Sequence, residues 1–105
     1  MQFQLNTDNH IQGDERLAQI AESAVSSALG HLTDRLSRTE VHLVDVNGTK
    51  GGADDIKCTI EARPEGMKPQ TVTYTDSDVE AALRGAGQKL RALLDNEFGK
   101  LDKRR

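Results

Sequence analysis

The sequence predicts an α+β domain with two layers, in which a four-stranded sheet carries both helices on one face in the order β-α-β-β-β-α. Three observations support this fold class. Four short segments alternate apolar and polar residues, which is typical of half-buried strands. Two longer segments repeat apolar residues at spacings of three and four, which is typical of amphipathic helices. The chain has 105 residues, so residues 1–105 are expected to form one domain.

The first strand and the first helix are separated by a run of turn residues. Residues 2–5 alternate polar and apolar side chains and predict a short strand. From Asp14 the period becomes helical; Asp14 or Gly13 can cap this helix, which is expected to end near Leu36 or Ser37. Its apolar stripe consists of Leu17, Ile20, Ala21, Ala24, Ala28, Leu29 and Leu32.

Three further strands are expected at residues 39–46, 56–63 and 70–75. The first is rich in β-branched residues, and the other two alternate apolar and polar side chains. Residues 64–69 hold two prolines and a glycine and predict a turn. These three strands should form an antiparallel meander.

The second helix is expected to begin with a capping box formed by Ser77 and Glu80 and to end near Leu101. The basic tail, about residues 102–105, should fray. Gly85 and Gly87 lie in the helix interior, where each glycine costs about 1 kcal/mol relative to alanine. We expect a compensation, namely close packing of the two helices through small residues.

The stretch "DVNGTKGGADDIKCTIEAR" at residues 45–63 gathers three glycines and Lys50. A phosphate-binding P-loop needs G-x-x-x-x-G-K-[ST] followed by a helix. Here the lysine precedes the glycine pair and a strand is expected next. This stretch is therefore interpreted as a flexible hairpin loop.

No catalytic constellation is evident. The three histidines (His10, His31 and His42) lack a second ligand at a spacing typical of zinc, so no metal site is expected. Cys58 falls on the apolar side of its strand, where a buried thiol is expected. We therefore expect a protein that is not an enzyme, without cofactor or small-molecule substrate.

Composition indicates a soluble, cytoplasmic protein. A single cysteine permits no internal disulfide, and neither a signal peptide nor a membrane-spanning segment is evident. The net charge of −3 is unevenly distributed: residues 1–56 carry four basic and nine acidic residues, or −5. Residues 81–105 carry seven basic and three acidic residues, or +4, so an anionic partner is expected to bind the C-terminal part.

Basic residues follow both flanks of the second helix. Arg84 and Arg91, seven residues apart, share one flank, and Lys89 lies on the other. They form either an ordinary solubilising surface or a surface that contacts phosphates. The aromatic residues Phe3, Tyr74 and Phe98 are expected in the core or at its rim, so base stacking has little support and recognition should depend on shape and backbone charge.

Two parts of the chain resemble the ribosome hibernation-promoting factor and ribosome-associated inhibitor family, also called ribosomal subunit interface proteins. The motifs are N-G-x-K-G-G, D-I-K-C and I-E-A-R within residues 45–66, and "SDVEAALRGAGQKLRALLDNEFGKL" at residues 77–101. The resemblance covers nearly the whole chain and implies the same β-α-β-β-β-α fold, which is similar to double-stranded-RNA-binding domains. The chain looks like a short form, without the C-terminal dimerising domain of long members, and is expected to be a monomer or weak dimer.

The resemblance also implies a function. The protein would bind the rRNA of the small ribosomal subunit, in the decoding channel, and limit translation in idle ribosomes as part of hibernation under stress. Matching basic positions of the family are Lys50, Lys57, Arg84, Lys89 and Arg91. An alternative of another class is a protein–protein adaptor that has kept the fold and lost the RNA-binding surface, as suggested by the acidic first half and by Asp54 and Asp55.

Overall fold

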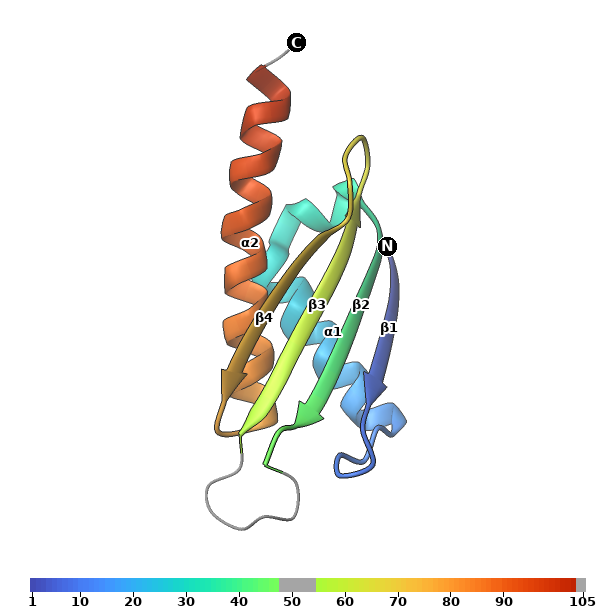
Figure 1. The fold of residues 1–105 in the computed structure, drawn as a ribbon. Coiled ribbons are helices and arrows are strands. Elements are labelled where there is room, and N and C mark those ends of the chain that lie inside the picture. Colours follow the sequence, from blue (N-terminus) through green and yellow to red (C-terminus); the bar gives the residue numbers. More distant parts are fainter. Residues whose placement is uncertain (48–54, 104–105) are drawn as a thin grey trace.

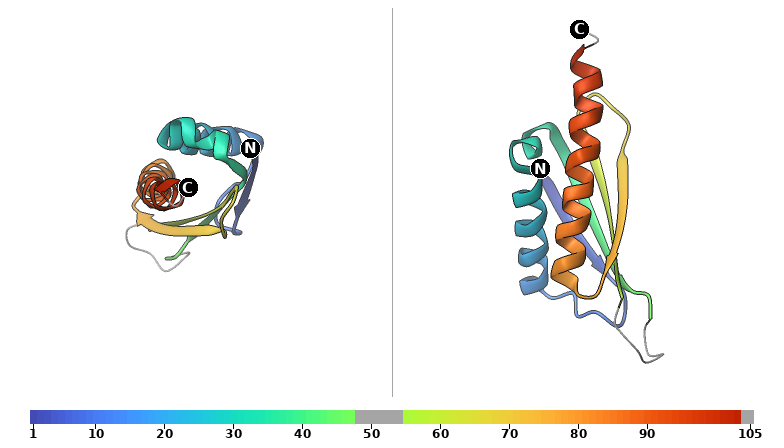
Figure 2. Two further views of the ribbon diagram at one scale, coloured as in Figure 1. Left: turned by 90° about the horizontal axis from the view of Figure 1, so that it is seen from above. Right: turned by 90° about the vertical axis from the view of Figure 1, so that its left-hand side faces the viewer.

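The computed structural model describes residues 1–47 and 55–103 and has the expected α+β architecture. Four strands form one sheet in the order β1-β2-β3-β4 (Figure 1). Both helices cover the same face of this sheet (Figure 2). The elements are β1 (Gln2–Thr7), α1 (Glu15–Leu29), the 3-10 helix η1 (Gly30–Arg35), β2 (Leu36–Asp45), β3 (Ile56–Pro64), β4 (Gln70–Asp76) and α2 (Val79–Lys103).

The strand pairing confirms the expected meander. β1 pairs with β2 in parallel, whereas β2–β3 and β3–β4 are antiparallel. One row of the register joins Leu5, Val41, Ile60 and Val72 across all four strands. These side chains belong to the core between sheet and helices, or pack against it. The period-two alternation in the sequence thus places the apolar side chains against the helices and the polar ones on the open face.

The first helix starts as predicted and ends earlier than predicted. Asp14 caps it, because its Oδ1 accepts a hydrogen bond from the Leu17 N–H at 2.9 Å. The α-helix ends at Leu29, and Gly30 follows with φ 57°, a left-handed conformation that stops the helix. The prediction of an end near Leu36 or Ser37 was therefore wrong, and β2 already begins at Leu36.

The predicted capping box of the second helix was also wrong. The cap of α2 is Asp78, whose Oδ1 accepts a hydrogen bond from the Ala81 N–H at 2.8 Å. The sequence "DSDVE" holds several residues that can cap a helix, and the structure uses the aspartate one position after Ser77. The helix continues to Lys103, beyond the expected end at Leu101. The final residues of the predicted frayed tail, 104–105, lie outside the described part of the chain.

The two interior glycines of α2 are explained by two different neighbours. A Cβ atom on Gly87 would lie 2.8 Å from the Ala28 Cβ of α1, closer than carbon atoms normally approach. A Cβ atom on Gly85 would instead collide with the ring of Tyr74 on β4. The expected close packing through small residues is thus present at Gly87, while Gly85 makes room for an aromatic ring.

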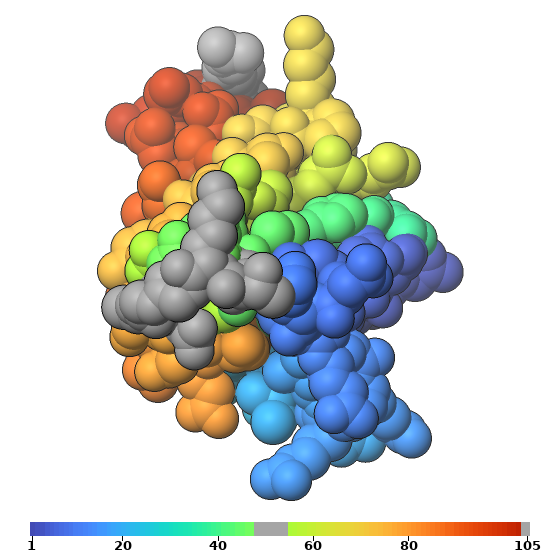
Figure 3. All heavy atoms as spheres, turned by 60° about the horizontal axis from the view of Figure 1, so that its bottom comes forward, coloured from blue at the N-terminus to red at the C-terminus, as the bar shows by residue number. Residues whose placement is uncertain are grey.

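The two helices run parallel and begin at the same end of the molecule, where β2 also ends and β3 begins (Figure 1). Figure 3 looks toward this end and shows the start of α1 (light blue) beside the start of α2 (orange). As expected, a strand and no helix follows the glycine loop. The predicted hairpin conformation of residues 48–54, which include Lys50, lies outside the described residues.

Candidate nucleic-acid interface

A groove of about 850 Å³ lies on the solvent side of the two helices, between α1 and the N-terminal half of α2. Ile20, Ala24 and Ala28 of α1 contribute its apolar surface. Polar and charged side chains from both helices complete the lining: Arg16, Gln19, Ser23, Ser27, Glu80, Arg84 and Gln88. The groove is therefore a surface depression with an apolar strip and polar walls.

Two arginines line this groove from opposite helices, Arg16 from α1 and Arg84 from α2. Both are exposed, and neither forms an ion pair with any described residue. Glu80, also in the lining, forms none either. Guanidinium groups without a carboxylate partner keep their donors available for an anion such as a phosphate.

Lys89 and Arg91 lie on opposite flanks of α2. The Lys89 ammonium donates a hydrogen bond to the backbone carbonyl of Thr73 on β4 at 2.9 Å, so its charge is held at the edge of the sheet. Arg91 lies on the α1 side, where Nη1 donates to the carbonyl of Ala28 at 3.1 Å and Nε pairs with Asp95 at 3.2 Å. Arg91 thus binds a carbonyl of the last turn of α1, which lacks a partner within its helix.

The remaining predicted positions are separate from these. Lys57 is exposed on β3 and alternates with the buried Ile56 and Cys58, so it belongs to the open face of the sheet. It forms no ion pair with a described residue. The structure therefore places Arg84 and Lys89 on opposite flanks of α2 and places Lys57 on the open face of the sheet.

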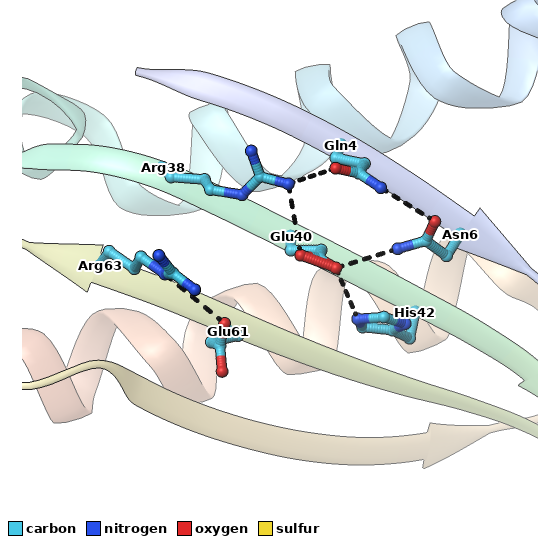
Figure 4. A network of polar contacts seen from close by, with 7 residues as sticks. All are labelled: Gln4, Asn6, Arg38, Glu40, His42, Glu61 and Arg63. Atoms are coloured by element: carbon cyan, nitrogen blue, oxygen red, sulfur yellow. Dashed lines mark hydrogen bonds and ion pairs between the residues drawn. The ribbon is translucent and has the colours of Figure 1, made fainter.

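The open face of the sheet has a different electrostatic character, because most of its charged residues are paired (Figure 4). Glu40 accepts from Asn6 at 3.2 Å and pairs with Arg38 at 3.5 Å and with His42 at 3.2 Å. On β3, Glu61 and Arg63 lie 3.8 Å apart. Positive and negative groups alternate along these strands, so this face offers few unpaired cations to a phosphate backbone.

Arg16 was not among the predicted contacts. It lies far from Arg84 in the sequence, and only the packing of α1 beside α2 places both arginines in one groove. The predicted order of strands and helices could have indicated that Arg16 and Arg84 lie near each other. Because β1 and β2 are parallel neighbours and β4 points the same way as both, the helices that pack on this sheet must begin at the same end.

Cys58 is buried, as its position on the apolar side of its strand predicted. Burial raises the pKa of the Cys58 thiol to about 12, so the thiol stays protonated at neutral pH. Within residues 1–47 and 55–103, no group of three or more His, Cys, Asp or Glu side chains is placed to hold a metal ion. None of the described helices is long and apolar enough to span a membrane.

Comparison with known proteins supports the fold. No family model and no curated protein matches the sequence. A solved ribosomal subunit interface protein from Coxiella burnetii superimposes with a TM-score of 0.75 at 11% identity, covering 94% of this chain and 99% of that one. The Thermus thermophilus Protein Y N-terminal domain gives a TM-score of 0.72 at 17% identity, covering 91% and 98%. The chain therefore has, over nearly its whole length, the fold of a ribosomal subunit interface protein, as the sequence motifs implied.

Proposed function

We propose that this protein is a non-catalytic, cytoplasmic factor that binds the rRNA of the small ribosomal subunit and limits translation in idle ribosomes. The observation that carries the proposal is the pair Arg16 and Arg84, which face one groove from two helices without an ion partner among the described residues. The proposal is also supported by the fold, which this chain shares with a protein named a ribosomal subunit interface protein and with the Protein Y N-terminal domain.

The arrangement suits a phosphate backbone better than a base edge. The guanidinium of an arginine can bind a phosphate bidentately, and the two groups approach from opposite walls of an open groove. Lys89 adds positive charge on the other flank of α2, at the edge of the sheet and outside the groove. Lys50, Lys57 and Arg91 remain predicted contacts, but Arg91 already has two described partners and Lys57 faces the other way.

The direct test is co-sedimentation with purified small subunits over a series of salt concentrations. Each phosphate contact that is lost should reduce the slope of log K against log salt by about 0.7 to 0.9. Arg16→Gln and Arg84→Gln should each lower this slope and weaken binding. Arg63→Gln is the matched control, because it removes the same charge from the open face, where Arg63 is paired with Glu61.

Equal losses for all three variants would show that net charge, and no particular surface, drives association. Binding that does not depend on salt would contradict phosphate contacts altogether. The effect on translation is measured separately, in a reconstituted reaction to which the protein is added. The wild type should reduce reporter synthesis, and Arg16→Gln and Arg84→Gln should reduce it less, in proportion to their lost affinity.

A second candidate is the protein–protein adaptor, which is favoured by the open face of the sheet. The paired groups Arg38, Glu40, His42, Glu61 and Arg63 form a polar surface of mixed charge, which suits a protein partner better than RNA. A partner that is recovered after nuclease treatment, and lost on Glu40→Lys but not on Arg84→Gln, would support the adaptor.

A further inference from the structure

Tyr74 on β4 lies across the backbone of α2 at Gly85. A Cβ atom on Gly85 would lie 2.7 Å from Tyr74 Cζ and closer still to the neighbouring ring atoms Cε2 and Cδ2. A ring that met this position edge-on would bring two carbons near and leave the third well apart. Three adjacent ring carbons at similar short distances therefore indicate that one face of the ring rests on the glycine.

Part of the Tyr74 side chain reaches solvent. Tyr74 is 38% exposed, and β4 is an edge strand with no described strand beyond it. No described residue forms a hydrogen bond with the Tyr74 hydroxyl, so the ring is held by packing alone. The helix thus supports one face of an aromatic ring, and a glycine that costs helix stability makes this support possible.

Positive charge lies next to this ring. The Lys89 ammonium is bound to the carbonyl of Thr73, the residue just before Tyr74. Lys89 follows Gly85 by four residues in α2, so it lies about one turn from the glycine on the same face of the helix. Arg84 lines the groove on the α1 side. Asp76 is the nearest carboxylate along β4 toward α2, and its Oδ1 accepts from the Ser77 N–H at 2.7 Å.

We propose that Tyr74 is a stacking platform for one unpaired nucleobase, with the phosphate of that nucleotide bound by Lys89. A flat aromatic ring that is partly exposed beside a fixed cation matches a nucleotide, which combines a planar base with a negative phosphate. The inference rests on the proposed function, since it names an unpaired nucleotide as part of the RNA that the helical surface binds. It revises the expectation that recognition depends on shape and backbone charge, with little support for base stacking.

The chain allows a direct spectroscopic test, because Tyr74 is its only tyrosine and it has no tryptophan. Tyrosine emission therefore reports on this ring alone, and a stacked base quenches it. The probes are a single-stranded oligouridylate and an RNA hairpin with the same number of phosphates, whose two strands are joined by a non-nucleotide linker so that every base is paired. The oligouridylate should give saturable quenching, whereas the hairpin should bind with little change in emission.

Affinity measurements with labelled oligouridylate distinguish aromatic stacking from the effect of apolar side-chain volume. Tyr74→Leu keeps an apolar side chain but loses the aromatic face, so affinity should fall about 5- to 150-fold. Tyr74→Phe keeps the face and should bind within about twofold of the wild type, since the hydroxyl makes no described hydrogen bond. Circular dichroism and melting curves check that both variants stay folded.

The outcomes distinguish this inference from the proposed function. If oligouridylate binds with unchanged emission, and Tyr74→Leu binds as well as the wild type, the stacking platform is refuted while RNA binding stands. Equal quenching by hairpin and single strand would also refute it, because a paired base cannot stack on the ring. If the wild type binds neither RNA nor small subunits, the proposed function fails, and the stacking role fails with it.

Discussion

The contact between Gly87 and Ala28 can be tested by adding a single methyl group. In Gly87→Ala the new Cβ would lie 2.8 Å from the Ala28 Cβ. Carbon atoms prefer a separation of about 3.5 to 4.0 Å, so α1 and α2 must move apart or rotate. Overpacking of this kind typically costs about 1 to 3 kcal/mol, against a gain of about 1 kcal/mol from replacing glycine in a helix. We therefore expect Gly87→Ala to lie between neutral and about 2 kcal/mol less stable.

Gly99 in the same helix supplies the matched control. A Cβ atom there meets nothing within 4 Å, so Gly99→Ala should show the helix propensity alone. It should raise the free energy of unfolding by about 1 kcal/mol. The difference between the two variants, about 1 to 3 kcal/mol, is then the cost of the collision. Urea unfolding at 25 °C measures both values.

A double-mutant cycle identifies the partner. Ala28→Gly alone should cost about 1 kcal/mol, because it places a glycine within α1. In the Gly87→Ala background, the same change removes the colliding methyl group. The double variant should therefore be about 1 to 3 kcal/mol more stable than the sum of the single effects. If Gly87→Ala is as stabilising as Gly99→Ala, or if the cycle is additive, the close contact does not constrain the helices.

Three further results are expected. Asp8 has a lowered pKa: burial alone would raise it, but backbone hydrogen bonds, those from Asp45 and His10 foremost, and the charge of His10 lower it by more. The stabilisation that ionised Asp8 gives the folded protein is present at pH values above its ordinary pKa of 3.8 and is lost as the pH falls below that value. The difference in unfolding free energy between the wild type and Asp8→Asn should therefore become smaller below this pH. Cys58 should react with a thiol reagent only as fast as the protein unfolds, and rapid labelling of the folded state would contradict its burial. Arg35→Met removes the paired hydrogen bonds to Asp102, at 3.1 and 3.2 Å. It should therefore lower stability by about 1 kcal/mol and speed amide exchange in the last turn of α2. Unchanged exchange would show that this turn is stable without Arg35.

The positions of the strands could be predicted closely from the sequence, whereas the end of α1 could not. Leu32 and Leu36 continue the apolar spacing of α1, and both are buried, at 4% and 3% exposure. However, Leu32 lies in η1 and Leu36 is the first residue of β2. Apolar spacing reports which residues are buried and does not report the backbone conformation that buries them. The local signal was Gly30, whose left-handed conformation ends the helix.

In the candidate site, features within one helix could likewise be predicted from the sequence, whereas contacts between elements could not. The flanks of α2 follow from helical geometry, so the separation of Arg84 from Lys89 was predictable. The pairing of Arg91 with Asp95 was also visible, since residues four apart in a helix are neighbours. By contrast, Arg16 joins Arg84 only through the packing of α1 on α2. The ring of Tyr74 over Gly85 likewise depends on contact between a strand and a helix, which no local pattern encodes.

The net charge of −3 does not argue against the helical surface as an RNA contact, because screening makes a bound phosphate respond mainly to nearby charges. At physiological ionic strength the Debye length is about 8 Å, so a phosphate in the groove interacts mainly with the residues that line it. Those residues include two arginines and one glutamate. Glu40 and Glu61 lie on the open face of the sheet and are already paired with Arg38 and Arg63, so they contribute little at the groove. Phosphate binding therefore depends on the net charge of the unpaired side chains that line the groove, and this local charge is positive between the two helices.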